Sequence, residues 1–178
     1  MSDRWSRAFV IGGARSGKSR YAEMLAEAFS EELIYLATAE VRDREMADRV
    51  AAHKARRSGQ WRTVEAPVAL PESIAEVSKP GSIVLVDCLT LWLSNVMLSG
   101  ASVDDAQHRL MAAMSAAPGR MVLVSNEVGL GIVPDNALAR RFRDAQGRLN
   151  QNVASNADLV VFMAAGLPLY LKGAALAS

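Results

Sequence analysis

A glycine-rich run close to the N-terminus constrains this chain more than any other feature. It fits the pattern G-x-x-x-x-G-K-[ST] and consists of Gly12, Gly13, Ala14, Arg15, Ser16, Gly17, Lys18 and Ser19. Apolar residues 8–11 precede the run and predict a buried strand, and the residues from 18 to about 29 have the apolar spacing of a helix. This order is typical of a phosphate-binding loop, or P-loop. The simpler alternative is a turn that only connects the strand to the helix.

The residue types in this run suit the binding of a nucleoside triphosphate. Glycines allow successive backbone N–H groups to turn towards anionic oxygens. Lys18 would bring a positive charge to the β- and γ-phosphates, which makes it a candidate catalytic residue. The hydroxyl of Ser19 is a candidate ligand for Mg²⁺. The run therefore predicts a site for a nucleotide and its metal ion.

Composition limits the classes of protein to which the chain can belong. Its 178 residues predict one domain over positions 1–178. With 51% hydrophobic residues, 22% charged residues and a net charge of +1, neither disorder nor a nucleic-acid partner is expected. The single cysteine, Cys88, cannot form an internal disulfide, and the N-terminus has no signal-peptide pattern. We therefore expect a cytoplasmic protein without a membrane span.

Short apolar runs alternate with longer segments of helical spacing along the chain. The expected strands are at 8–11, 33–36, 62–65, 83–86, 121–124 and 159–163. The expected helices are at 21–29, 44–56, 70–77, 89–97, 103–116 and 137–154. This alternation predicts an α/β fold, with a mostly parallel central sheet and helices on both faces. Residues 167–172 follow Gly166 and predict an antiparallel C-terminal edge strand.

Polar side chains follow two of the expected strands. Asp87 directly follows the apolar run 83–86. In P-loop enzymes a carboxylate in this position, at the end of a buried strand, holds Mg²⁺ or its waters. Asp87 could instead be the N-cap of the helix that follows. Asn126 and Glu127 come shortly after the strand at 121–124, and ligands collect at the carboxyl ends of parallel strands. We expect Gly12, Asp87 and these two residues to meet in one crevice, where Glu127 either faces a substrate or is a solvated loop acid.

The chain contains two histidines, His53 and His108. His108 lies in a polar stretch and is most simply an exposed helix residue. His53 is followed by Lys54, Arg56 and Arg57, and a neutral imidazole among cations could attack a phosphorus atom. Judged by composition alone, the segment is most simply a solvated basic helix face.

Several blocks of sequence, taken together, resemble one enzyme family. They are residues 12–20, 35–39, 45–46 with 53–54, 61–65, 87–92 and 126–134. The family is that of the bifunctional adenosylcobinamide kinase/adenosylcobinamide-phosphate guanylyltransferases of cobalamin synthesis. The resemblance runs from about Phe9 to about Leu171, and the Asn-Glu-Val-Gly block at 126–129 is specific to the family. It implies a RecA-like P-loop fold and two successive reactions.

The first implied reaction moves the γ-phosphate of ATP or GTP to a hydroxyl of adenosylcobinamide. The second joins GMP from GTP to that phosphate through a covalent GMP-histidine, and His53 matches the guanylylated position. Asp87, where some members carry Glu, and Ser19 would hold Mg²⁺. The resemblance also implies a homo-oligomer, with a trimer known in the family. Beyond residues 12–19, the matching nucleotide contacts are Ala37, Thr38, Ala39, Lys54, Ala55, Arg56, Arg57, Glu65 and Asp87.

Two other functions are compatible with a P-loop. A plain small-molecule kinase would need Lys18, Ser19 and Asp87 but not His53, and a nucleotide switch or assembly ATPase would need no acceptor site. For the corrinoid ring, the sequence offers Trp61 and the loop 128–134 as candidates, and also Trp92, although core packing is its simpler role.

Overall fold

A computed structural model describes residues 5–29, 31–40, 44 and 59–174. Its strands are β1 (Arg7–Gly12), β2 (Glu32–Ala37), β3 (Trp61–Glu65), β4 (Ser82–Asp87), β5 (Arg120–Asn126), β6 (Leu159–Ala164) and β7 (Leu167–Lys172). Its helices are α1 (Lys18–Glu27), α3 (Leu70–Val77), α4 (Leu89–Leu98), α5 (Val103–Ala116) and α6 (Ala137–Asn156). Each of these elements was predicted from the sequence. The helix expected at 44–56 lies, apart from Arg44, outside the described residues.

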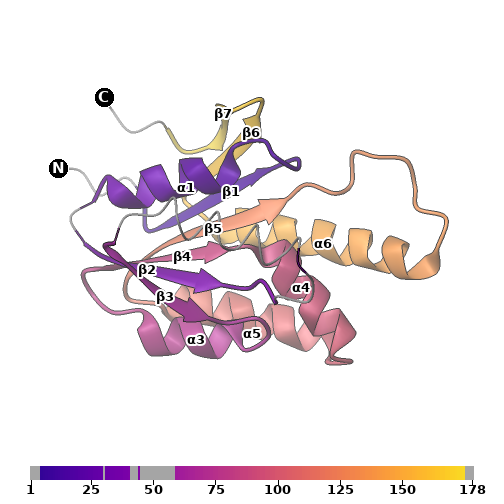
Figure 1. The fold of residues 1–178 in the computed structure, drawn as a ribbon, viewed down its shortest axis with the longest axis horizontal. Helices are drawn as coiled ribbons and strands as arrows, with labels where there is room; N and C mark the ends of the chain where they lie inside the picture. Colours follow the sequence, from indigo (N-terminus) through magenta and orange to yellow (C-terminus); the bar gives the residue numbers. More distant parts are fainter. Residues whose placement is uncertain (1–4, 30, 41–43, 45–58, 175–178) are drawn as a thin grey trace.

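The strands form a single sheet in the order β3-β2-β4-β5-β1-β6-β7 (Figure 1). Strands β1 to β6 pair in parallel, and β7 pairs antiparallel with β6. The predicted mostly parallel sheet with an antiparallel C-terminal edge strand is therefore confirmed. Strand β5 separates the P-loop strand β1 from β4, which ends in Asp87.

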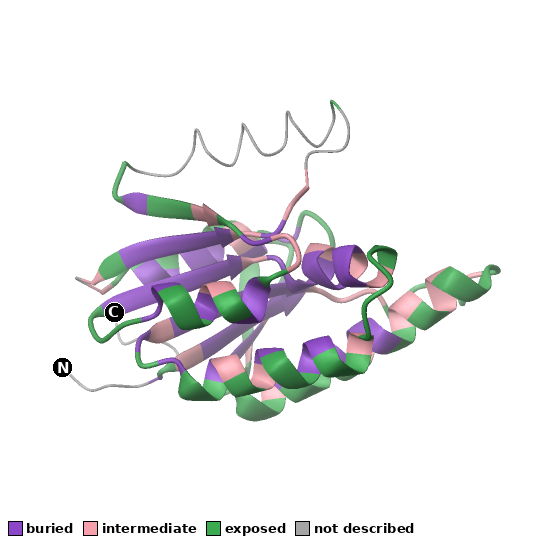
Figure 2. Cartoon of the chain, turned by 90° about the horizontal axis from the view of Figure 1, so that it is seen from below, coloured by how far each residue is buried: buried purple, intermediate pink, exposed green. Residues whose placement is uncertain are grey.

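Both faces of the sheet are covered by helices. Successive residues of β1 point to opposite faces of the sheet, and both faces are buried. Phe9 belongs to the buried hydrophobic cluster on one face, and Val10 belongs to the cluster on the other. Tyr21 and Leu25 of α1 pack on the face of Val10, while helices α3, α4, α5 and α6 pack on the face of Phe9. Figure 2 shows the inner strands buried and the outward sides of the helices exposed. None of the helices in the described ranges has the length and apolar character needed to cross a bilayer.

The strand register brings the predicted site residues to one edge of the sheet. Gly12 of β1 pairs with Asn126 of β5. Ala37 of β2 pairs with both Glu65 of β3 and Asp87 of β4. Because these strands are parallel, all these ends lie at the carboxyl edge. The loop 127–136 and the start of α6 extend beyond this edge (Figure 1).

Candidate active site

The P-loop connects β1 to α1, and two of its glycines cannot be replaced without strain. Gly17 is the N-cap of α1 and has a φ of 95°, in the left-handed region that favours glycine. A Cβ at Gly12 would lie 2.4 Å from the carbonyl oxygen of Met163 on β6. The glycines at these positions are thus explained by backbone conformation and by close packing on the neighbouring strand.

Neighbouring segments fix the shape of the P-loop. The N–H of Gly166, in the turn between β6 and β7, donates a hydrogen bond of 3.1 Å to the Ser16 carbonyl. From the other side, the N–H of Glu127 donates to the Gly12 carbonyl at 3.0 Å. These two bonds hold the loop in place from the ends of both strands that flank β1.

Lys18 begins α1, and its side chain is 7% exposed. Its ammonium donates a hydrogen bond of 2.5 Å to the Gly13 carbonyl and one of 3.4 Å to the Ser16 hydroxyl, both within its own loop. Burial lowers the pKa of Lys18, and its interactions with Cys88 and Asp87 act in the opposite direction. The ammonium and the carboxylate at the end of β4 therefore belong to one electrostatic site.

Asp87 is the last residue of β4, and its Oδ2 accepts a hydrogen bond of 3.1 Å from the hydroxyl of Tyr35. Cys88, not Asp87, is the N-cap of α4, so the alternative role of Asp87 as that N-cap is wrong. The side chain of Asp87 instead accepts the Tyr35 bond and interacts electrostatically with Lys18.

The residues expected to contact nucleotide on β2 and β3 lie beside Asp87. Ala37 and Ala39 are half-buried, and Glu65 is exposed at the end of β3. Thr38 is fully buried, and its hydroxyl accepts a hydrogen bond from the Cys88 N–H and donates one to the Cys88 carbonyl, both at 2.7 Å. The hydroxyl of Thr38 thus stabilises the joint between β4 and α4.

A second part of the predicted site lies outside the described residues. It consists of His53, Lys54, Ala55, Arg56 and Arg57. Their proposed roles stay predictions. The other histidine, His108, is exposed on α5, as predicted.

A buried polar network joins the end of β5 at Asn126 to helices α4 and α6, and it was not predicted from the sequence. Ser125 donates a hydrogen bond of 2.7 Å to Asn150 Oδ1 and accepts one of 2.9 Å from Gln146. The backbone N–H of Asn126 donates to the Thr90 hydroxyl at 2.8 Å, and its carbonyl accepts from Asn150 at 3.2 Å. Gln146 and Asn150 are four residues apart on the buried face of α6, and that spacing was the available signal.

The loop 127–134 carries apolar side chains that are exposed to solvent. Leu130 is 83% exposed and Ile132 is 97% exposed. By contrast, Trp92 is fully buried, and Trp61 is buried with its Nε1 donating to Glu27 at 2.9 Å. The simpler prediction for Trp92, a role in core packing, is thus confirmed. The suggestion that Trp61 contacts a corrinoid is wrong, because its side chain is buried.

The oxygen groups at the site fit Mg²⁺. Ser19 offers a hydroxyl at the start of α1, and Asp87 offers the carboxylate oxygen to which Tyr35 does not donate. Mg²⁺ commonly takes one or two protein oxygens and completes its coordination with phosphates and waters. These two residues would hold the ion together with a nucleotide.

The fold and the P-loop define a nucleotide-binding protein with the RecA-like architecture. Solved structures of similar fold include a prototypical ATPase from the type III secretion system of pathogenic bacteria, with a TM-score of 0.53 and 15% identity. That comparison covers 93% of this chain and 56% of the other. A second is the ATPase EscN of enteropathogenic E. coli, with a TM-score of 0.51, 14% identity and coverage of 90% and 43%. The predicted RecA-like P-loop fold is confirmed.

Sequence comparison identifies the family within this class. The family described as "Cobinamide kinase / cobinamide phosphate guanyltransferase" matches residues 8–171. A bifunctional adenosylcobalamin biosynthesis protein, CobP of Pseudomonas aeruginosa, is 46% identical over 94% of this chain and 98% of its own length. CobU of Salmonella typhimurium is 40% identical over 92% and 98%. The chain belongs to this family of bifunctional transferases.

Proposed function

We propose that this chain, as one catalytic domain of 178 residues, carries out two steps of cobalamin synthesis. It first phosphorylates adenosylcobinamide with ATP or GTP, and it then transfers GMP from GTP to adenosylcobinamide phosphate. The observation that carries the proposal is the family match over residues 8–171, which includes an intact P-loop at the carboxyl edge of the sheet.

In the kinase step, the P-loop residues 12–19 bind and orient the triphosphate. Phosphate oxygens replace the Gly13 and Ser16 oxygens as partners of the Lys18 ammonium. Because Lys18 is buried, its charge acts with little screening on the transferred phosphoryl group. Mg²⁺, when held by Ser19 and Asp87, supplies further neutralisation of the phosphate charge. The oxygen of the acceptor hydroxyl forms the new bond to the γ-phosphorus while the bond to the β–γ bridging oxygen breaks. The nucleoside diphosphate leaves, and the hydroxyl proton passes to water.

In the guanylyl step, we assign the nucleophile to His53 on the family resemblance and its basic neighbours. The neutral imidazole attacks the α-phosphorus of GTP, an N–P bond forms, and pyrophosphate leaves. A phosphate oxygen of adenosylcobinamide phosphate then attacks the same phosphorus and releases the histidine. Lys54, Arg56 and Arg57 would neutralise phosphate charge around His53, while Ala37, Thr38, Ala39, Ala55, Glu65 and Asp87 complete the proposed nucleotide site.

The loop 127–134 is our candidate for the corrinoid contact. It leaves β5 at Asn126, and the N–H of Glu127 donates to the Gly12 carbonyl, so this loop begins beside the P-loop that would hold the phosphates. Its apolar side chains Leu130 and Ile132 are exposed, as a surface that binds a large ring requires.

We also propose a cytoplasmic homo-oligomer, with a trimer as the expected form. Leu167, Leu169 and Leu171 are exposed along the edge strand β7, which suits contact with another subunit. Both nucleotide substrates are cytoplasmic metabolites, and the near-zero net charge gives no reason to expect a nucleic-acid partner. Sedimentation equilibrium measures the subunit number, and a monomer at micromolar concentration would refute the oligomer.

Two labelled substrates test the proposed reactions. With ATP labelled at the γ-phosphate and adenosylcobinamide, the label should enter adenosylcobinamide phosphate. With GTP labelled at the α-phosphate and adenosylcobinamide phosphate, the label should enter adenosylcobinamide-GDP, and a chelator of Mg²⁺ should stop both transfers. A plain kinase would give only the first product, and a nucleotide switch would give neither.

A further inference from the structure

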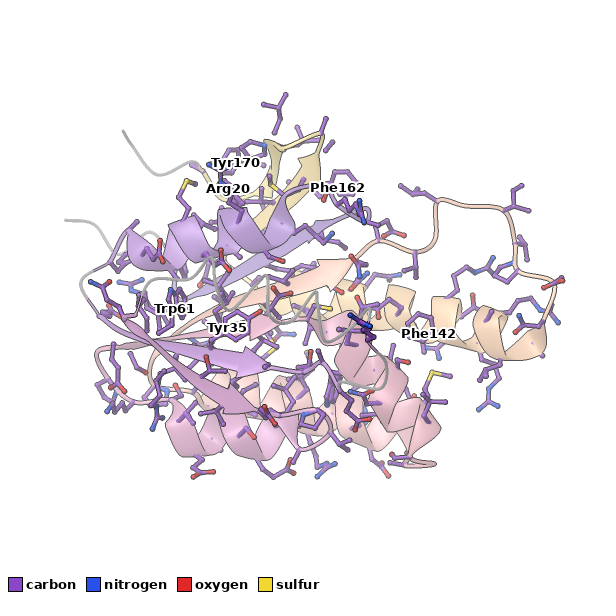
Figure 3. The ribbon with its side chains drawn as sticks, viewed as in Figure 1. Arg20, Tyr35, Trp61, Phe142, Phe162 and Tyr170 are labelled. Atoms are coloured by element: carbon purple, nitrogen blue, oxygen red, sulfur yellow. The ribbon has the colours of Figure 1, made fainter. Side chains whose placement is uncertain are left out.

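Strand β2 supplies a buried hydroxyl to the end of β4. Tyr35 is 5% exposed, and its hydroxyl donates a hydrogen bond of 3.1 Å to Asp87 Oδ2. Its ring packs edge to face on Trp61 of β3, with centroids 6.1 Å apart and an interplanar angle of 88°. Figure 3 shows these two rings beside each other on neighbouring strands. Packing therefore fixes the position from which the hydroxyl donates.

The strand register explains how Tyr35 reaches Asp87. Ala37 pairs directly with Asp87, and Tyr35 lies two residues earlier on the same face of β2. Tyr35 is thus a diagonal neighbour of Asp87 across this parallel pair, and its long aromatic side chain spans the gap to the carboxylate. A shorter side chain at position 35 would leave the carboxylate without this donor.

The same end of β2 also fixes the main chain after Asp87. The Thr38 hydroxyl is bonded to both the N–H and the carbonyl of Cys88. The amide of Asn95 on α4 donates to the Thr38 carbonyl at 2.9 Å, which ties Thr38 itself to the helix. Side chain and main chain at the end of β4 are thus both held from β2.

We propose that Tyr35 is a positioning residue that orients the Asp87 carboxylate for the metal ion bound with the nucleotide. This inference rests on the proposed metal role of Asp87. The hydroxyl donates to Oδ2, so Oδ1 is the oxygen that would coordinate the ion. Without that bond, the carboxylate is free to turn towards the ammonium of Lys18, with which it already interacts. Such a pair would remove both groups from the nucleotide and its metal.

The test compares Tyr35→Phe with Tyr21→Phe. Both substitutions remove one buried phenolic hydroxyl, but that of Tyr21 is bonded to Tyr170 at 2.7 Å instead of to Asp87. Mn²⁺ binding is measured by electron paramagnetic resonance with a non-hydrolysable GTP analogue present, and binding of the analogue is measured separately in EDTA. Tyr35→Phe should weaken Mn²⁺ binding about tenfold, as loss of an outer-shell partner does, with analogue binding in EDTA changed less than about twofold. Tyr21→Phe should change neither quantity.

Asp87→Asn separates failure of the inference from failure of the proposed function. If Asp87→Asn weakens Mn²⁺ binding and Tyr35→Phe does not, the role of Tyr35 is refuted and the metal role of Asp87 stands. If neither variant weakens it, the metal role of Asp87 fails and the inference fails with it. If Tyr35→Phe weakens analogue binding equally in EDTA, Tyr35 has only a structural role.

Discussion

The P-loop and the loop 127–136 lie at the same edge of the sheet, but they are built in opposite ways. The P-loop buries Ser16 and Lys18 and is hydrogen-bonded to segments at both flanking strands. The loop 127–136 exposes Leu130 and Ile132 almost completely. Among the bonds that the structure describes, those from this loop to the rest of the protein lie only near its two ends, where Glu127 bonds to Gly12 and where Pro134 and Asp135 bond to Arg140. The nucleotide side of the site is therefore preorganised, whereas the other side presents apolar surface that a large substrate would cover.

The largest effect is expected where the P-loop packs most closely. Gly12→Ala places a methyl group 2.4 Å from the Met163 carbonyl oxygen, so the backbone must shift. We expect a loss of about 2–4 kcal/mol in the free energy of unfolding. Urea denaturation measures it, and binding of a fluorescent GTP analogue should weaken as well.

Gly13→Ala is the matched control for stability, because a Cβ there meets no atom within 4 Å. Its unfolding free energy should stay within about 0.5 kcal/mol of the parent protein. Equal stability of the two variants would show that β6 does not fix the P-loop.

The next largest effect is expected in the alkylation rate of Cys88, which lies on the nucleotide side of the site. Burial raises the pKa of its thiol to about 11. At pH 8 roughly one thiol in a thousand is then ionised, so iodoacetamide should react about 100-fold more slowly than with the urea-unfolded protein. Because only the thiolate reacts, the rate should rise as the pH approaches 11. Mass spectrometry follows the alkylation, and equal rates in the folded and unfolded protein would contradict the burial of this thiol.

The anchor of the exposed loop should contribute less to stability than the packing of Gly12. Asn150→Ala removes a donor to the Asn126 carbonyl and an acceptor for Ser125. We expect a loss of about 2 kcal/mol, since buried groups are left without partners. Asn152, exposed on the same helix, is the control, and Asn152→Ala should be nearly neutral in the same urea titration. A neutral Asn150→Ala would mean that the network does not hold the loop.

The smallest effect is expected on the loop itself, and it should appear in substrate binding alone. Replacing Leu130 and Ile132 by Ser should raise the KM for adenosylcobinamide about tenfold, because apolar contact area is lost. The free energy of unfolding should hardly change, since these side chains are exposed in the folded protein. Met24→Gln, at an exposed position on α1, is the control and should leave the KM unchanged. An unchanged KM in the double variant would exclude the loop as the corrinoid contact.

The two sides of the site also differ in how far the sequence predicts them. The P-loop is a contiguous pattern, and its strand and helix have clear apolar spacing, so residues 12–19 and the carboxyl-edge position of Asp87 could be predicted. The bond from Tyr35 to Asp87 joins residues 52 positions apart and depends on strand order and register, which local patterns do not specify. The role of the Thr38 hydroxyl could not be predicted either, because its partner Cys88 is 50 positions away in the sequence.

The buried polar network at Asn126 could be predicted from the sequence only in part. Polar residues at 146 and 150 interrupt the apolar face of α6, which is unusual for a face that packs on a sheet. Their partner Ser125 lies on β5, and only the packing of α6 against the end of β5 brings the three together. Sequence spacing could therefore identify the polar helix face but not the backbone that it fixes.

Covalent labelling tests the central claim most directly, since a guanylylated histidine would distinguish the proposed guanylyltransferase from a plain kinase or a nucleotide switch. The protein is incubated with Mg²⁺ and GTP labelled at the α-phosphate, without a corrinoid, then denatured and mapped by peptide. We predict an acid-labile, alkali-stable label on the peptide that contains His53, absent in His53→Ala and retained in His108→Ala. Folded protein that binds GTP but retains no label after denaturation would contradict the account.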